Sequence, residues 1–190
     1  MKYKLLTVAL LTFSSIAFSQ SGRSLWNTTT KKSDMIPLES RMVLPEKNLF
    51  TLNLDQLRTV LSNAPQRFGE ARRNGITLSI PNENGVLESF NVYENPVLDP
   101  ALAARYPEIK SYIGIGIDNP TATSYFSVSP LGFKAMTLSA DKAAVFIEPI
   151  SQDLTTYTVY RKSDKTRSLS AFECSVIDDV VPQVDPSTLR

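Results

Sequence analysis

Short stretches of strand-forming residues recur through the second half of the chain, and this recurrence limits the possible fold more than any other feature. Apolar and β-branched residues gather at intervals of about ten residues, in residues 109–117, 125–128, 133–138, 145–147 and 157–160. Turn-forming residues separate these stretches at 118–120, 130–132, 139–141 and 151–153. Five short strands joined by tight turns predict an antiparallel meander or sandwich.

The residues before this run add a hairpin and two small helices. Residues 49–52 form a strand candidate, and Asn53 follows as the N-cap of an amphipathic helix that Pro65 ends. A hairpin is expected over residues 76–92, with its turn at 81–85. A short helix over 101–106 follows, opened by an aspartate and a proline. We therefore predict a mainly β (α+β) domain at residues 47–162, with about seven short strands in an antiparallel sheet or sandwich and two small helices.

The first residues have the three parts of a secretory signal peptide. Lys2 and Lys4 form a basic start, residues 5–18 are mostly apolar, and the small residues Ala17 and Ser19 precede an expected cleavage before Gln20. The apolar run is shorter than the ~20 residues that cross a bilayer. We therefore predict a signal peptide at residues 1–19, a secreted or extracellular location and no stable membrane anchor.

Polar segments flank the predicted domain on both sides. Residues 20–46 are expected to form an extended arm, and residues 163–190 a flexible linker or inhibitory tail. No closing element follows the tail, so we expect the chain to continue past Arg190.

Composition excludes several classes of function. Twenty basic and nineteen acidic residues give a net charge of +1 without long blocks of either sign, which argues against a nucleic-acid partner. The chain has no histidine, so neither Ser-His-Asp nor Cys-His catalysis can be built from it. Eight carboxylates at turns or strand edges are interpreted as solvated surface: Glu83, Glu88, Glu94, Asp99, Glu108, Asp118, Asp141 and Glu148. We therefore expect neither a catalytic site nor a cofactor in these residues.

The sequence Gly114-Ile115-Gly116 lacks the third glycine and the following helix of a dinucleotide-binding loop. It is interpreted as small residues on one face of a strand.

Cys174 is the only cysteine, so no disulfide can form within the chain. One interpretation is a small buried apolar residue beside Phe172 and Val176. The other is a thiolate ligand for a zinc ion held by a different domain, where it would displace the water that performs hydrolysis.

Several phrases of the chain resemble a known family. They read NPVLDP at 95–100, LAARYPEIKSY at 102–112, GIG at 114–116, FSVSPLGF at 126–133 and IEP at 147–149. These phrases are similar to the N-terminal propeptide of secreted reprolysin-like (metzincin) zinc metalloproteases of Bacteroidetes-type bacteria. The resemblance covers most of residues 45–162.

The resemblance implies a zymogen prodomain that assists folding and keeps a following protease domain silent. The partner would be the cognate metalloprotease domain of the same precursor, which would hold the zinc. Related proteases use a propeptide cysteine as the latent zinc ligand, so the resemblance makes Cys174 a candidate cysteine switch. The sequence around this cysteine is FECS at 172–175, whereas the usual motif of the family is of the Pro-Lys-Met-Cys-Gly type.

Two other functions stay open from the sequence. One is a secreted β-sandwich binding or interaction module with no protease attached, using Tyr93, Tyr112, Tyr125 and Tyr157 as exposed contacts. The other is a standalone hydrolase based on paired carboxylates.

Overall fold

The computed structural model of the chain describes residues 25–30, 35–38, 44–69 and 74–164. The predicted signal peptide, most of the predicted tail and Cys174 lie outside these residues.

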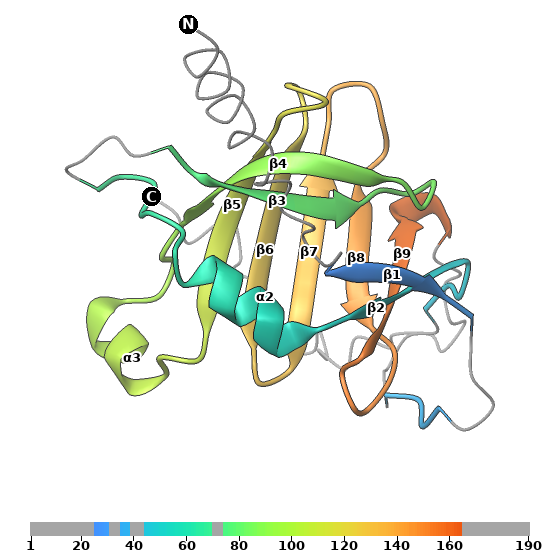
Figure 1. The fold of residues 1–190 in the computed structure, drawn as a ribbon, viewed down its shortest axis with the longest axis horizontal. Coiled ribbons are helices and arrows are strands. Elements are labelled where there is room, and N and C mark those ends of the chain that lie inside the picture. The colour runs from blue at the N-terminus through green and yellow to red at the C-terminus, as the bar shows by residue number, and fades with distance from the viewer. Residues whose placement is uncertain (1–24, 31–34, 39–43, 70–73, 165–190) are drawn as a thin grey trace, which may run out of the picture.

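The described residues form one curled antiparallel sheet of nine strands with two α-helices, which confirms the predicted fold class (Figure 1). Along the sheet the strands follow the order β1-β2-β9-β8-β7-β6-β5-β4-β3. Their bounds are β1 Trp26–Thr29, β2 Asn48–Leu52, β3 Ile76–Pro81, β4 Leu87–Glu94, β5 Lys110–Gly116, β6 Thr123–Ser129, β7 Gly132–Leu138, β8 Val145–Pro149 and β9 Thr156–Arg161. Strands β3 to β9 are a simple meander, and the sheet curls into a half-barrel (Figure 1).

Strand β1 lies in the segment that the sequence predicts as an extended arm, and it raises the strand count above the predicted seven. It pairs with β2, so that Trp26 lies opposite Leu52. The indole of Trp26 packs edge-on against Phe133 and Tyr157, with ring centroids 5.3 and 5.7 Å away. Part of the arm therefore belongs to the folded body.

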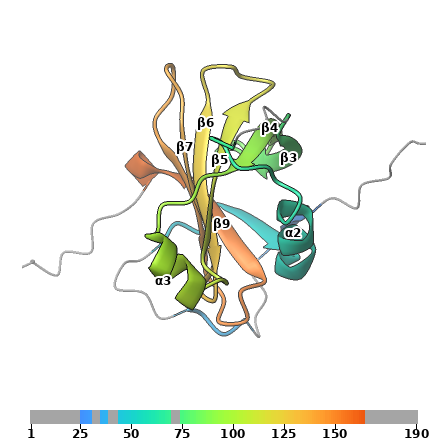
Figure 2. The ribbon, with the colours of Figure 1, turned by 90° about the vertical axis from the view of Figure 1, so that its left-hand side faces the viewer.

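The inner face of the half-barrel carries the main apolar core. Helix α2 (Leu54–Leu61) stands against this face and buries Leu57 and Leu61 in it (Figure 2). The helix begins as predicted, because the Asn53 side chain accepts a hydrogen bond of 2.9 Å from the backbone N–H of Gln56. It ends before Pro65, also as predicted.

Helix α3 (Pro100–Arg105) precedes β5 and buries none of its side chains. Asp99 caps it by accepting a hydrogen bond of 2.9 Å from the Ala101 N–H, and Pro100 takes the first helical position, as predicted. The chain then turns through Tyr106 and enters β5. A single 3-10 turn, η1 (Lys162–Asp164), follows β9.

The glycines of β5 make room for neighbouring groups. A Cβ atom on Gly114 would lie 3.1 Å from the Cβ of Phe90, and one on Gly116 would lie 2.0 Å from the carbonyl oxygen of Asn119. This close packing agrees with the interpretation of these residues as small groups within a strand.

Candidate binding cavity

A cavity of about 600 Å³ opens between α2 and the sheet, at the end of the half-barrel where α3 joins β5. This volume lies within the range of about 300–1,000 Å³ that is usual for ligand sites in proteins. Its walls are built from Arg58, Leu61, Ser62, Glu94, Pro107, Glu108, Lys110, Tyr112, Val128 and Pro130. They therefore come from α2, β4, β5, β6 and the adjoining loops.

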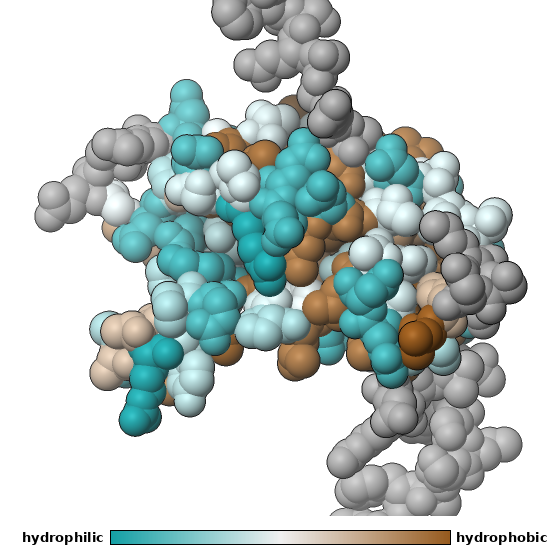
Figure 3. All heavy atoms as spheres, turned by 60° about the horizontal axis from the view of Figure 1, so that its bottom comes forward, coloured by the Kyte–Doolittle hydropathy of each residue, from teal (hydrophilic) through white to brown (hydrophobic). Residues whose placement is uncertain are grey.

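The floor of the cavity is apolar and its rim is charged. Leu61, Tyr112 and Val128 are each less than a tenth exposed and belong to the core. Figure 3, which turns this end of the molecule towards the viewer, shows apolar surface between groups of hydrophilic side chains. An amphipathic ligand would match this arrangement, with its apolar part inside.

The cations at the rim already have partners. Lys110 Nζ lies 2.7 Å from Glu94 Oε1. Arg58 Nη1 lies 3.1 Å from a carboxylate oxygen of Asp55, and its Nη2 donates a 3.2 Å hydrogen bond to the Ser129 carbonyl. The rim therefore carries paired positive and negative side chains and no surplus of one sign.

Tyr112 is the most buried polar residue of the wall. Its ring stacks on Phe126 with centroids 5.3 Å apart, and the residue is 6% exposed. Its hydroxyl makes no hydrogen bond to any other described residue. Burial, and then the negative charge of Glu94, raise the pKa of the Tyr112 hydroxyl to about 12. At neutral pH the hydroxyl therefore keeps its proton and is available as a donor.

A second, shallower hollow of about 380 Å³ lies across β5 to β8, and several of its lining side chains come from the outer face of the sheet. These include Tyr125, Met136 and Phe146. Tyr125 is 43% exposed.

The expectation of four exposed tyrosine contacts is wrong for two of them. Tyr112 and Tyr157 are buried, because the strand registers turn both side chains towards the inner face. The Tyr157 hydroxyl accepts a hydrogen bond of 3.3 Å from the Phe133 N–H. Tyr93 is half-buried, so Tyr125 is the most exposed of the four.

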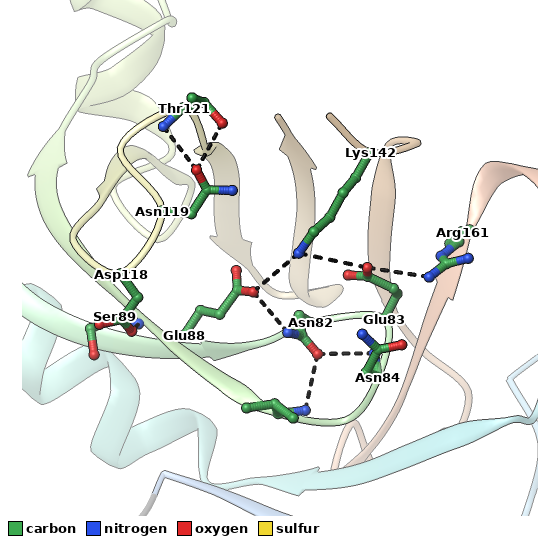
Figure 4. A network of polar contacts seen from close by, with 11 residues as sticks. Asn82, Glu83, Asn84, Glu88, Ser89, Asp118, Asn119, Thr121, Lys142 and Arg161 are labelled. Carbon is green, nitrogen blue, oxygen red and sulfur yellow. Dashed lines mark hydrogen bonds and ion pairs between the residues drawn. The ribbon is translucent and has the colours of Figure 1, made fainter. Parts of the chain in front are cut away.

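The expectation that the turn carboxylates are solvated is wrong for Glu83. Its side chain is only 4% exposed and lies 3.3 Å from Arg161 Nη2 and 3.9 Å from Lys142 Nζ (Figure 4). Glu88 lies 3.7 Å from the same lysine and accepts a hydrogen bond of 2.8 Å from Asn82 Nδ2. This cluster holds the β3–β4 turn against β9, so its role is structural.

Within the described part of the chain, no group of three or more acidic, histidine or cysteine side chains is placed to hold a metal ion. No helix there is long and apolar enough to cross a membrane. Cys174, the one metal-ligand candidate from the sequence, lies outside the described residues. The sequence singles out Glu94, Glu108 and Tyr112 separately but does not predict the cavity, because its residues come from four elements that only the fold brings together.

Comparisons of the chain with protein-family models, with curated proteins and with solved structures find no match.

Proposed function

We propose that this chain is the N-terminal prodomain of a secreted zinc metalloendopeptidase. Its role is to assist the folding of a following protease domain and to keep it latent, and its own residues perform no catalysis. The zinc ion belongs to the protease domain, and Cys174 is the proposed latent ligand. The chemistry is that of a thiolate occupying the zinc position that hydrolytic water needs.

The main support for this proposal is the position in the fold of the sequence segments that resemble the family. Six of the ten residues around the cavity belong to two of these phrases: Pro107, Glu108, Lys110 and Tyr112 to residues 102–112, and Val128 and Pro130 to residues 126–133. Residues that lie in segments similar to the family's sequence and also surround one cavity are expected to serve a common binding role.

The first test is the reading frame beyond codon 190. The proposal expects a His-Glu-x-x-His-x-x-Gly-x-x-His stretch within about 200 residues. A stop codon, or a second β-rich module in that place, overturns the prodomain function.

The second test uses the full precursor and separates the cysteine from the rest of the domain. Cys174→Ser is expected to release proteolysis of a peptide substrate before processing, several-fold above the wild-type precursor, because water regains the zinc position. Ser175→Ala is the matched control and should stay latent. Unchanged latency of Cys174→Ser would reject the switch role and leave the prodomain function standing.

A second candidate function is a secreted binding module with no protease attached. The observation that favours it is the cavity, whose size and apolar floor suit a ligand whatever follows the chain. The reading frame beyond codon 190 also decides between the two functions.

A further inference from the structure

We propose that the cavity between α2 and strands β5 and β6 binds an uncharged, extended polypeptide segment with apolar side chains, and that the Tyr112 hydroxyl donates a hydrogen bond to a carbonyl of its main chain. The assignment of this segment to the downstream protease domain rests on the proposed function. The binding itself does not.

The shape and floor of the cavity fit apolar side chains. Its volume of about 600 Å³ gives room for a few residues, and its most buried lining side chains are Leu61 and Val128, each 2% exposed. Pro107 and Pro130 also line the cavity. Apolar side chains entering this space would leave water for an apolar surface, which is the main driving force of association.

The charges at the rim favour an uncharged segment. A charged ligand would have to compete with the Lys110–Glu94 pair, whose closest atoms are 2.7 Å apart, or with the contacts of Arg58. Glu108 adds one further negative charge to the wall. The rim carries both positive and negative side chains, and both cations are already paired. A charged ligand that is attracted by one member of a pair would therefore be repelled by the other.

The Tyr112 hydroxyl indicates which polar group the ligand should carry. None of the described residues accepts a hydrogen bond from this hydroxyl, and its oxygen is not among their fully buried, unpartnered side-chain atoms, so it is free to donate to a ligand that enters the cavity. The hydroxyl is protonated at neutral pH, as its raised pKa of about 12 requires, so the partner to which it can donate is an acceptor. A peptide carbonyl is an uncharged acceptor that comes with apolar side chains on either side. A polypeptide segment therefore fits both the apolar floor and the available donor of this cavity.

The experiment uses the 190-residue chain purified from an exporting host. The probes are acetyl-Leu-Val-Leu-amide and its charged counterpart acetyl-Leu-Asp-Leu-amide, each titrated by NMR or calorimetry. The uncharged probe is expected to bind saturably, and the charged probe at least about tenfold more weakly, because its carboxylate would have to leave water for a cavity whose cations are already paired. No saturable binding of the uncharged probe in the millimolar range, or equal binding of both probes, overturns the proposal.

The first pair of variants tests the tyrosine. Tyr112→Phe keeps the stacked ring and removes the hydroxyl, so it is expected to weaken binding of the uncharged probe about fivefold. Tyr125→Phe makes the same chemical change on the outer face and should leave binding unchanged. Equal effects of the two variants would show that the Tyr112 hydroxyl is not the donor.

The second pair tests the location without altering the core. Ser62 lines the cavity and Asn63, its neighbour, does not, and both are exposed at the C-terminal end of α2, where a lysine is tolerated. Ser62→Lys is expected to weaken binding about tenfold, because the probe would have to displace or desolvate the long charged side chain added to the cavity wall, whereas Asn63→Lys should bind as the wild type does. Matching affinities would place the probe elsewhere. None of these results depends on a protease following the chain, so failure here is distinct from failure of the prodomain function.

Discussion

The carboxylate of Glu83 lies 3.3 Å from the guanidinium of Arg161, a residue 78 positions later in the chain. This contact ties the β3–β4 turn to the end of β9, and the Glu83 carbonyl also accepts a hydrogen bond of 2.7 Å from Asn48 Nδ2 on β2. The polar cluster occupies the opposite end of the strands from the cavity. One end of the half-barrel is thus held by charged contacts, and the other end carries the cavity.

Glu83→Gln is expected to lower the free energy of unfolding by about 1–2 kcal/mol. The cost is that of a nearly buried carboxylate losing its charge, reduced because Arg161 and Lys142 are both more than a third exposed and can be solvated. Urea denaturation followed by circular dichroism measures it. The control Asp55→Asn removes a carboxylate whose side chain is 93% exposed and should change stability by less than about 0.5 kcal/mol. Similar losses in both variants would contradict the structural role of Glu83.

Trp26→Ala is expected to destabilise the domain by about 3–4 kcal/mol, because Trp26 is 3% exposed and packs against three aromatic rings. The midpoint of urea denaturation, read by circular dichroism, checks this. Thr28→Ala, at an exposed position of the same strand, should cost less than about 1 kcal/mol. A neutral Trp26→Ala would mean that β1 contributes nothing to the stability of the domain.

The elements that the sequence predicts correctly are those set by local chemistry. The caps Asn53 and Asp99 and the turn prolines act within a few residues of themselves, so their effect is readable from the chain. Strand β1 cannot be predicted from its neighbouring residues in this way. It contributes one buried residue, Trp26, whose partner Leu52 on β2 lies 26 positions later in the chain.

Burial of the tyrosines needs the register of the whole sheet. Tyr112 and Ile113 are neighbours on opposite faces of β5, yet both are less than a tenth exposed. Alternation along this strand therefore does not reveal which face is solvated, and Tyr112 cannot be told from the exposed Tyr125 by sequence alone. The burial of Glu83 has the same origin, because the residues that cover and pair with it come from distant strands.

Gly116→Ala is expected to destabilise the domain by about 2–3 kcal/mol. The new Cβ would lie 2.0 Å from the Asn119 carbonyl, which itself accepts the Ala122 N–H at 2.9 Å, so the turn between β5 and β6 would have to move. Gly69→Ala is the matched control, since its nearest atom would be 3.5 Å away and its effect should stay below about 1 kcal/mol. Thermal denaturation of the two variants side by side checks the difference. Equal melting temperatures would contradict the close approach at Gly116.

Stability is expected to fall steeply above pH 10, because three buried tyrosines hold their protons more tightly in the folded chain than in the unfolded one. Burial raises the pKa of Tyr112 to about 12 with help from the charge of Glu94, and burial is also the main cause that raises the pKa of Tyr157 and Tyr160. In the unfolded chain tyrosines lose their protons near pH 10. Above that pH the unfolded state binds fewer protons than the folded state, so the free energy of unfolding decreases as pH rises.

For Tyr112 the stabilising contribution is complete below pH 10 and is lost as the pH rises from there through about 12. Each such tyrosine contributes a slope of about 1.4 kcal/mol per pH unit within its window. Tyr112→Phe, which cannot ionise, should therefore reduce the slope of unfolding free energy against pH between 10 and 12 by about this amount. Urea denaturation at half-unit pH steps measures the slope in the wild type and in the variant. An unchanged slope would mean that the Tyr112 hydroxyl ionises equally easily in both states, which is incompatible with its burial against Phe126 and beside Glu94.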